Sequence, residues 1–271
     1  MEQQEILDKM HGLHLILADE VKRICEKYDI HYFMIAGTLL GAIRHKGFIP
    51  WDDDMDFGMK RCDYEKFLVV SEKELDHSVF TLQTDRNDRY YAFNFAKLRL
   101  NGTKVLESFS SKVSTNQGIY IDIFPLDYVY PSPVKRFFQF KSFWLFRNLL
   151  WVKCGYGDNE RKKQFSYKLA HFLSLFFSIN ALKKLKYHAI TGCNESEYLV
   201  TSDGTYGLQR ETIKSKWISE TADYTFEDRV YQGIKDYDAY LSYFYGDYLT
   251  PPPETNRNHH GRMEVDFGRY K

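Results

Sequence analysis

The stretch from Tyr32 to Met59 constrains the fold of this chain more than any other, because a short apolar run leads into a glycine and a hydroxyl and then into a cluster of carboxylates. Residues 32–35 have the length and composition of a buried strand. Gly37 and Thr38 follow, and residues 39–45 can form a short helix. A strand that turns into a helix leaves backbone N–H groups unpaired at the helix start, where an anion can bind. The sequence therefore predicts an anion-binding turn at Gly37 and Thr38.

Four carboxylates follow within five residues, at Asp52, Asp53, Asp54 and Asp56. Polar and apolar residues alternate from Asp54 to Met59, as they do in a strand, so we expect Asp54 and Asp56 to point to the same face. Two neighbouring anions are unfavourable unless a cation compensates them, and Mg²⁺ prefers carboxylates together with water and phosphate oxygens. This pattern predicts Mg²⁺, or Mn²⁺ in its place, at Asp54 and Asp56. The alternative is an acidic turn in solvent.

A further carboxylate, Asp122, interrupts the segment from Gly118 to Phe124, which is otherwise typical of a buried central strand. An unpaired carboxylate in such a strand is costly or stays protonated. A metal ion shared with Asp54 and Asp56 would remove that cost. The alternative is that backbone N–H groups satisfy Asp122. Asp127, which follows the strand and a proline, is expected in a turn.

Residues 91–100 predict another strand, in which Lys97 and Arg99 continue a face of aromatic side chains. The end of this face either opens on the anionic site or lets the two cations reach solvent at the edge of the sheet. For Arg99 both alternatives stay open.

The other predicted elements are more conventional. Apolar residues at three-and-four spacing predict an amphipathic helix over residues 5–28. Asp63 can cap a second helix, and residues 79–83 have the composition of a strand. Residues 263–271 are expected to form a loose tail.

A basic and aromatic segment follows a proline-rich boundary at residues 130–133. Residues 134–190 contain twelve Lys or Arg against two Asp or Glu, although the whole chain is balanced at 37 of each. We expect two long helices here. They either have an ordinary solvated basic face, or they rest on an anionic membrane surface or a lipid-linked glycan. Nucleic-acid binding is less favoured, because no recognised module accompanies the charge.

Composition narrows the remaining possibilities. The length and the 44% hydrophobic content are sufficient for a buried core. Four widely spaced cysteines suit a reducing cytoplasm, and the polar, acidic start of the chain does not resemble a secretory signal. No uncharged apolar run is long enough to predict a spanning helix. We therefore expect a cytoplasmic protein, or a peripheral one on the inner face of the cell membrane.

The motif GTLLGAIRHKGFIPWDDDMDFGM, residues 37–59, resembles the signature of the LicD family, which shares the nucleotidyltransferase fold with fukutin-related proteins. Residues 121–127, IDIFPLD, and residues 237–260, YDAYLSYFYGDYLTPPPETNRNHH, are similar to further motifs of this family. The resemblance implies a mixed α/β fold, with a nucleotidyltransferase-like core sheet flanked by helices. Residues 1–130 would form the core, residues 131–190 a basic aromatic helical insertion, and residues 191–271 the part that completes the core and the acceptor side.

The resemblance also implies an activity. Members of the family transfer phosphocholine or a polyol phosphate from a CDP-linked donor such as CDP-choline to a hydroxyl of a lipid-linked or cell-surface glycan, such as lipopolysaccharide, teichoic acid or capsule, and release CMP. Metal-dependent phosphotransfer of this kind would use the carboxylates Asp52, Asp54, Asp56 and Asp122, with Asp54, Asp56 and Asp122 as metal ligands and Asp122 or Asp52 as the base. The donor would be bound by Gly37, Thr38, Arg44, Lys46, Lys97, Arg99 and His260.

Two other functions remain open. A nucleotidyltransferase would pass a nucleoside monophosphate to the acceptor with the same carboxylates. A membrane-surface glycan-binding protein would use the basic segment and need no catalysis.

Overall fold

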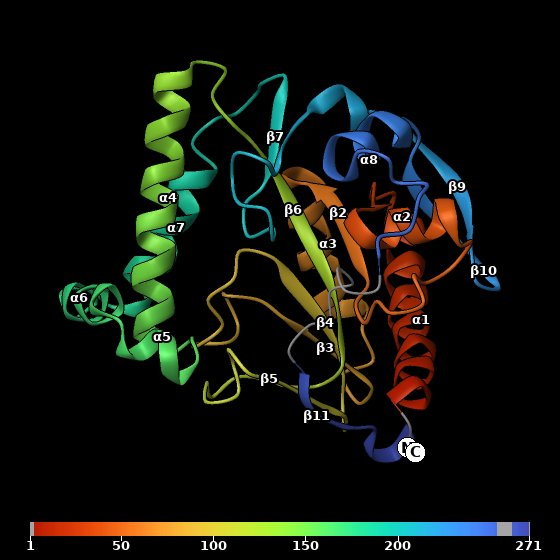
Figure 1. The fold of residues 1–271 in the computed structure, drawn as a ribbon, viewed down its shortest axis with the longest axis horizontal. Helices are drawn as coiled ribbons and strands as arrows, with labels where there is room; N and C mark the ends of the chain where they lie inside the picture. The colour runs from red at the N-terminus through yellow and green to blue at the C-terminus, as the bar shows by residue number, and fades with distance from the viewer. Residues whose placement is uncertain (1–2, 254–261, 271) are drawn as a thin grey trace.

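A computed structural model describes residues 3–253 and 262–270. A nine-stranded mixed sheet runs through the centre of the molecule, with helices packed around it (Figure 1). Its strands follow the order β3-β4-β6-β2-β1-β10-β9, and β7 and β8 continue from β6. The strands are β1 (Phe33–Met34), β2 (Asp56–Lys60), β3 (Phe80–Gln83), β4 (Ala96–Leu100), β6 (Tyr120–Tyr128), β7 (Tyr198–Thr201), β8 (Thr212–Lys214), β9 (Thr221–Phe226) and β10 (Arg229–Ile234).

Strands β2 and β6 lie next to each other in the middle of the sheet and run parallel. Their apolar side chains explain this position, because Phe57, Met59, Ile121 and Ile123 are all fully buried. β4 pairs antiparallel with β6 on one side, and β1 pairs antiparallel with β2 on the other. The mixed α/β class, with a core sheet flanked by helices, is confirmed.

The first helix, α1 (Gln3–Tyr28), matches the predicted amphipathic helix. The middle of its apolar stripe, at Leu17, Val21 and Ile24, is fully buried. α1 packs on α3 (Arg61–Glu74), and both contact the sheet, α1 at β4 and β6 and α3 at β2 and β6. The other helices of the core are α2 (Ala36–Arg44), α8 (Tyr237–Tyr245) and the short 3-10 helices Ser215–Ile218 and Gly268–Tyr270.

The basic segment forms four helices rather than two. They are α4 (Pro133–Cys154), α5 (Asn159–Lys163), α6 (Phe165–Ser174) and α7 (Ile179–Ile190). Pro133 opens α4, and Gly155 ends it in the left-handed conformation with φ 89°. In Figure 1 these helices form a separate layer on the left, where α6 projects beside α4. None of the helices within residues 3–253 and 262–270 has the length and apolar character needed to cross a membrane.

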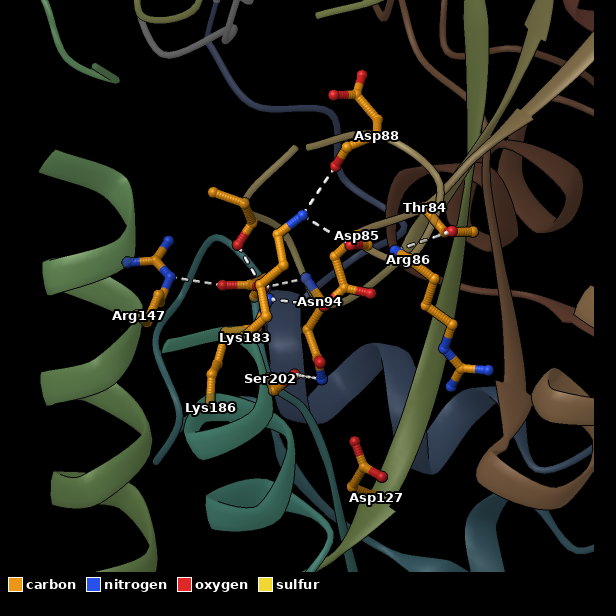
Figure 2. Close-up of polar contacts among 12 residues, drawn as sticks. Thr84, Asp85, Arg86, Asp88, Asn94, Asp127, Arg147, Lys183, Lys186 and Ser202 are labelled. Atoms are coloured by element: carbon orange, nitrogen blue, oxygen red, sulfur yellow. Dashed lines mark hydrogen bonds and ion pairs between the residues drawn. The ribbon is translucent and has the colours of Figure 1, made fainter. Parts of the chain in front are cut away.

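Part of the basic charge of this layer points inward (Figure 2). Lys183 donates to the carbonyl oxygens of Asp85 and Asp88 over 2.6 and 2.8 Å. Lys186 is fully buried, donates to the carbonyl oxygen of Ala92 over 3.0 Å, and lies 3.6 Å from the carboxylate of Asp85. These lysines fasten α7 to the loop before β4, so they are structural and do not belong to a solvated basic face.

Asp127 is not a turn residue, as the sequence suggested. β6 continues through Pro125 to Tyr128, and Pro125 is paired with Met59 in the ladder with β2. The Asp127 carboxylate is buried and accepts from Arg61 at both oxygens, over 2.7 and 2.6 Å. A bidentate arginine provides the compensation that burial of this carboxylate requires.

Three other local predictions are wrong. The strand expected over residues 91–100 begins only at Ala96, because the aromatic residues before it pack against the end of α4. Asp63 lies inside the first turn of α3, and Lys60 is the residue at the cap position. The expected loose tail instead contains β11 (Arg262–Asp266), which pairs with β5 (Lys104–Glu107) in a small second sheet.

Candidate active site

The carboxylates of Asp56 and Asp122 occupy matching positions on neighbouring strands. Asp56 opens β2, and Asp122 is its partner in the parallel ladder with β6. The N–H of Asp122 donates to the carbonyl oxygen of Met55 over 2.9 Å, which holds the start of β2 in register with β6. Adjacent strands lie about 4.8 Å apart, so partners on the same face bring their side chains together. The structure thus joins two of the three carboxylates that the sequence assigns to a metal ion.

Asp54 approaches this pair from a loop. β2 begins at Asp56, so Asp54 is not part of the strand alternation that was expected to align the two side chains. Residues 52–55 have no regular secondary structure. Asp54 nevertheless lines the same cavity as Asp52 and Asp56. The loop and the start of β2 therefore place the three carboxylates in the wall of one cavity. Asp54 and Asp56 do so without being the alternate residues of one strand that the sequence predicted.

This cavity has a volume of about 620 Å³. Its walls combine the start of α2, the carboxylate loop, Tyr206, and the segment that runs from Tyr245 to Pro253 after α8. Arg44 is the only Lys or Arg among the described residues that line this cavity. Cavities of a few hundred cubic ångström suit small-molecule ligands, and aromatic walls with a few charged groups orient them.

The charge around Asp56 is strongly unbalanced. Burial, and then the negative charges of Asp54, Asp122 and Asp52, raise the pKa of Asp56 well above its usual range, and Lys97 opposes this only weakly. A carboxyl group that is desolvated beside other carboxylates is stabilised either by a proton or by a cation. The cluster is therefore chemically suited to a hard cation with oxygen ligands.

Lys97 neutralises Asp122. The two residues are partners in the antiparallel ladder between β4 and β6, and Lys97 Nζ lies 2.8 and 3.0 Å from the two Asp122 oxygens. Burial lowers the pKa of Lys97, and burial raises the pKa of Asp122, so each charge depends on the other. The ammonium also lies 3.3 Å from the centre of the Tyr120 ring, whose hydroxyl donates to Glu107. The expected phosphate ligand is thus a partner of a site carboxylate.

The predicted anion-binding turn lies at the start of α2 and faces the carboxylates. Ala36 adopts a left-handed conformation with φ 48°, and its N–H donates to the hydroxyl of Tyr240 over 3.3 Å. An added Cβ at Gly37 would come within 2.6 Å of Asp52 Oδ2, so a side chain there would displace the Asp52 carboxylate. The Thr38 hydroxyl accepts the N–H of Asp56 over 2.8 Å. Thr38 therefore positions β2, and the Asp52 carboxylate lies against the helix start.

The other predicted donor-binding residues are distributed differently. Arg44 lines the cavity and donates to the carbonyl oxygen of Tyr248 over 2.9 Å. Lys46 is exposed, has φ 61°, and is not part of the cavity wall. Arg99 is buried and donates to Gln83 and to the carbonyl oxygen of Gly118, so the alternative that it reaches solvent was wrong, and a contact with the donor stays a prediction. His260 lies outside the described residues.

No ready-made three-ligand metal site is present in the described part of the chain, where no group of three or more His, Cys, Asp or Glu side chains is arranged to hold an ion. This agrees with the pairing of Asp122 to Lys97. Mg²⁺ in phosphate-transferring sites uses only one or two carboxylates, and water and substrate phosphate complete its shell. The excess of negative charge around Asp56 and the oxygen donors of Asp54 and Asp56 fit such an ion.

Sequence reasoning missed residues that reach the site from distant elements. His11 of α1 donates from Nε2 to the carbonyl oxygen of Asp52 over 2.7 Å and stacks on Phe48 with ring centres 3.9 Å apart. Tyr240 of α8 accepts the N–H of Ala36 at the start of α2, and Tyr245 of α8 lines the cavity. A histidine within an apolar helix stripe, and tyrosines in the YFYGDY motif, were the available signals.

Comparisons with known proteins agree with this arrangement. Residues 29–153 match the family model described as LicD/FKTN/FKRP, nucleotidyltransferase domain. The chain is 29% identical over 258 residues to the lipopolysaccharide cholinephosphotransferase LicD of Haemophilus influenzae, which covers 93% of this chain and 94% of that protein. It is also 27% identical over 128 residues to an uncharacterised protein of Rickettsia typhi, 45% of this chain and 37% of the relative.

The matched region contains α2, the carboxylate loop, β2, β4 and β6, so it includes Gly37, Asp54, Asp56, Lys97 and Asp122. The full-length similarity extends the match across the helical insertion and to α8, whose Tyr245 lines the cavity. Together, the domain match and the similarity over 93% of the chain support a protein of the LicD family.

Proposed function

We propose that the protein is a metal-dependent phosphotransferase that moves a phospho-substituent, phosphocholine or a polyol phosphate, from a CDP-linked donor to a hydroxyl of a lipid-linked or cell-surface glycan. The name of the Haemophilus influenzae relative supports a choline phosphate as the group and lipopolysaccharide as the acceptor. The observation that carries the proposal is the meeting of Asp56 and Asp122 in adjacent parallel strands, next to a cavity lined by Asp52, Asp54 and the start of α2.

Mg²⁺ would be held by Asp54 and Asp56, with Mn²⁺ as a substitute. When bound, the ion would neutralise the donor diphosphate and stabilise the charge that develops on its oxygens. Asp122 shapes the field at this site without being a free ligand, because Lys97 contacts both of its oxygens.

The residues of the chain would bind and orient the donor. Ala36 and Gly37 at the start of α2 line the cavity together with Asp52, and the N–H groups in the first turn of a helix, here at Gly37 and Thr38, favour phosphate oxygens. Arg44 adds a positive charge to the same wall. The aromatic rings of Tyr206 and Tyr245 provide surfaces on which a pyrimidine base can stack.

We assign the proton acceptor to Asp52 rather than Asp122. Asp52 lines the cavity, whereas the oxygens of Asp122 accept from Lys97. In the transfer step the acceptor oxygen forms a bond to the distal phosphorus, the phosphoanhydride bond breaks, CMP departs with the bonding electrons, and the hydroxyl proton passes to the carboxylate. Positioning and electrostatics carry most of such a reaction.

The alternative is a nucleotidyltransferase, which the description of the family domain favours. The products separate the two functions. Incubation with a panel of CDP-linked donors, a glycan acceptor and Mg²⁺ should give free CMP and a phosphorylated glycan, and the Asp56→Asn variant should give neither. A nucleotide attached to the acceptor would refute phosphotransfer and support the alternative.

We also propose that the protein works in the cytoplasm at the inner surface of the membrane. All four cysteines are free thiols, as a reducing compartment requires. α6 and the turn after it expose a set of large apolar side chains, which we call the α6 surface: Phe165, Leu169, Phe172, Leu173, Leu175 and Phe176. Phe165 and Phe176 are 80% and 72% exposed. With Lys162, Lys163 and Lys168 in the same segment, this surface suits an anionic leaflet.

A further inference from the structure

A second and larger cavity, of about 1010 Å³, runs along α4. We call it the α4 groove and define it by Arg136, Lys141 and Trp144 on α4 and by Tyr206, Lys214 and Trp217 on the facing wall. Thr205 and Tyr206 line both this groove and the carboxylate cavity. A molecule in the groove would therefore extend directly to the site where the donor is proposed to bind.

The charge of the α4 groove is positive. Its lining includes Arg136, Lys141, Arg147 and Lys214 but, among the residues that the structure describes, no Asp or Glu. Arg147 is paired with Asp203, which lies behind the wall. Lys141 and Lys214 are exposed, and neither forms an ion pair within the described chain. Two lysines without carboxylate partners in a concave surface favour an anionic ligand.

The rest of the lining suits a sugar. Trp144 is 58% exposed, and the rings of Trp217 and Tyr243 lie 5.4 Å apart on the opposite wall. Exposed aromatic rings bury the apolar faces of sugar rings, and their polar edges remain available for hydrogen bonds. Uncharged polar residues complete the surface and can bind hydroxyls: Ser202, Thr205, Gln209 and Thr212.

The two walls of the groove are held together before any ligand binds (Figure 2). Arg147 of α4 donates from Nε to Asp203 Oδ1 over 2.5 Å, and the N–H of Asn94 donates to the other oxygen over 2.6 Å. The Asn94 amide also donates to Ser202 Oγ over 2.7 Å. The Asp203 side chain is fully buried. This network fixes α4 against the segment after β7, so ligand binding needs little ordering of the walls.

We propose that the α4 groove binds the acceptor of the transfer, and that this acceptor is a glycan that carries phosphate or other anionic groups. The role of this glycan as the acceptor rests on the proposed function, whereas the binding of an anionic glycan is inferred from the groove alone. Lys141 and Lys214 contact the anionic groups, Trp144 packs on a sugar ring, and Tyr206 lies where the acceptor hydroxyl enters the carboxylate cavity.

Fluorescence anisotropy tests this with a labelled oligosaccharide that carries a phosphomonoester and with its dephosphorylated twin. The Lys141→Glu/Lys214→Glu double variant should bind the phosphorylated probe about tenfold more weakly or worse. The matched control, Lys168→Glu/Lys184→Glu, makes the same charge change at exposed positions of α6 and α7 outside the groove and should bind like the unmodified protein. Trp144→Ala should weaken binding of both twins.

Equal binding of the phosphorylated probe by the groove variant and the unmodified protein would overturn the inference, as would an equal loss in the control pair. A thymidine oligonucleotide that displaces the probe and binds more tightly would identify nucleic acid as the occupant and also overturn it. No donor is present in this measurement. Failure of every CDP-linked donor to release CMP would therefore refute the proposed function separately.

Discussion

At the scale of single residues, the ammonium of Lys97 compensates the negative charge of Asp122, one of the carboxylates that gather at the site. Both side chains are largely excluded from solvent, at 5% and 13% exposure. Removal of one partner from such a pair leaves the other charge buried and uncompensated, which is far more costly than the pair itself. Lys97 therefore stabilises the fold as well as the site.

We expect Lys97→Met to lower the free energy of unfolding by about 3–5 kcal/mol, measured by urea denaturation at neutral pH. Lys104→Met is the matched control, because Lys104 pairs with Glu264 at the surface, where the two side chains are 43% and 54% exposed. Its effect should stay below about 1 kcal/mol. Equal effects of the two substitutions would show that the Lys97 pair is not a buried one.

At the scale of elements, the segment between β7 and β8 lines both cavities and depends on a buried acid. Glu211 accepts the N–H of Tyr206 over 3.0 Å, and an added Cβ at Gly204 would displace the carboxyl group of Glu211. Burial raises the pKa of Glu211 to about 7. The folded protein thus binds a proton here that the unfolded chain releases near its ordinary pKa of 4.5.

The contribution of Glu211 to stability is full below pH 4.5 and is lost as the pH rises through 7, because ionisation is more costly in the folded state. Glu211→Gln keeps an acceptor for Tyr206 and removes the ionisation. The variant should be more stable than the unmodified protein at pH 8, by up to about 3 kcal/mol, with a flatter profile between pH 5 and 7 in thermal unfolding. Glu26→Gln, at an exposed position, should leave the profile unchanged. A Glu211→Gln profile parallel to that of the unmodified protein would contradict this account.

The elements near the site differ in how far local patterns predict them. Apolar runs predict β2 and β6, and two buried strands that each contain an acid suggest that Asp56 and Asp122 meet. The Lys97 partner depends on the register between β4 and β6, which no local pattern contains. Asp127 was misplaced for a similar reason, because its partner Arg61 is 66 residues away in the chain.

At the scale of the whole molecule, the carboxylate cavity, the α4 groove and the α6 surface lie in successive parts of the structure, from the core to the outer helical layer. The carboxylate cavity lies in the core, and the α4 groove lies between the core and the helical layer. α6 projects from that layer (Figure 1). The α4 wall of the groove and the α6 surface share one helical layer, in which α4 packs on α6.

Binding to vesicles of phosphatidylcholine and phosphatidylglycerol should depend on the α6 surface. We expect Phe172→Ser/Phe176→Ser to reduce the partition coefficient in vesicle sedimentation by about tenfold or more, because each buried phenyl ring contributes about 1.5–3 kcal/mol. Val69→Ser/Val230→Ser removes exposed apolar side chains elsewhere and should have no effect. Unchanged sedimentation of the Phe172/Phe176 variant, or no binding by the unmodified protein, would refute the membrane proposal.

The central claim is that the acids at the start of β2 hold a divalent cation, and Mn²⁺ binding measured by titration calorimetry and water-proton relaxation tests it most directly. The unmodified protein should bind Mn²⁺ in competition with Mg²⁺. Asp56→Asn should weaken this binding by at least about tenfold, since it removes a ligand oxygen and a charge. Asp247→Asn, a substitution in the segment after α8 that lines the same cavity, should preserve it. Mn²⁺ binding by Asp56→Asn that equals that of the unmodified protein would contradict the account.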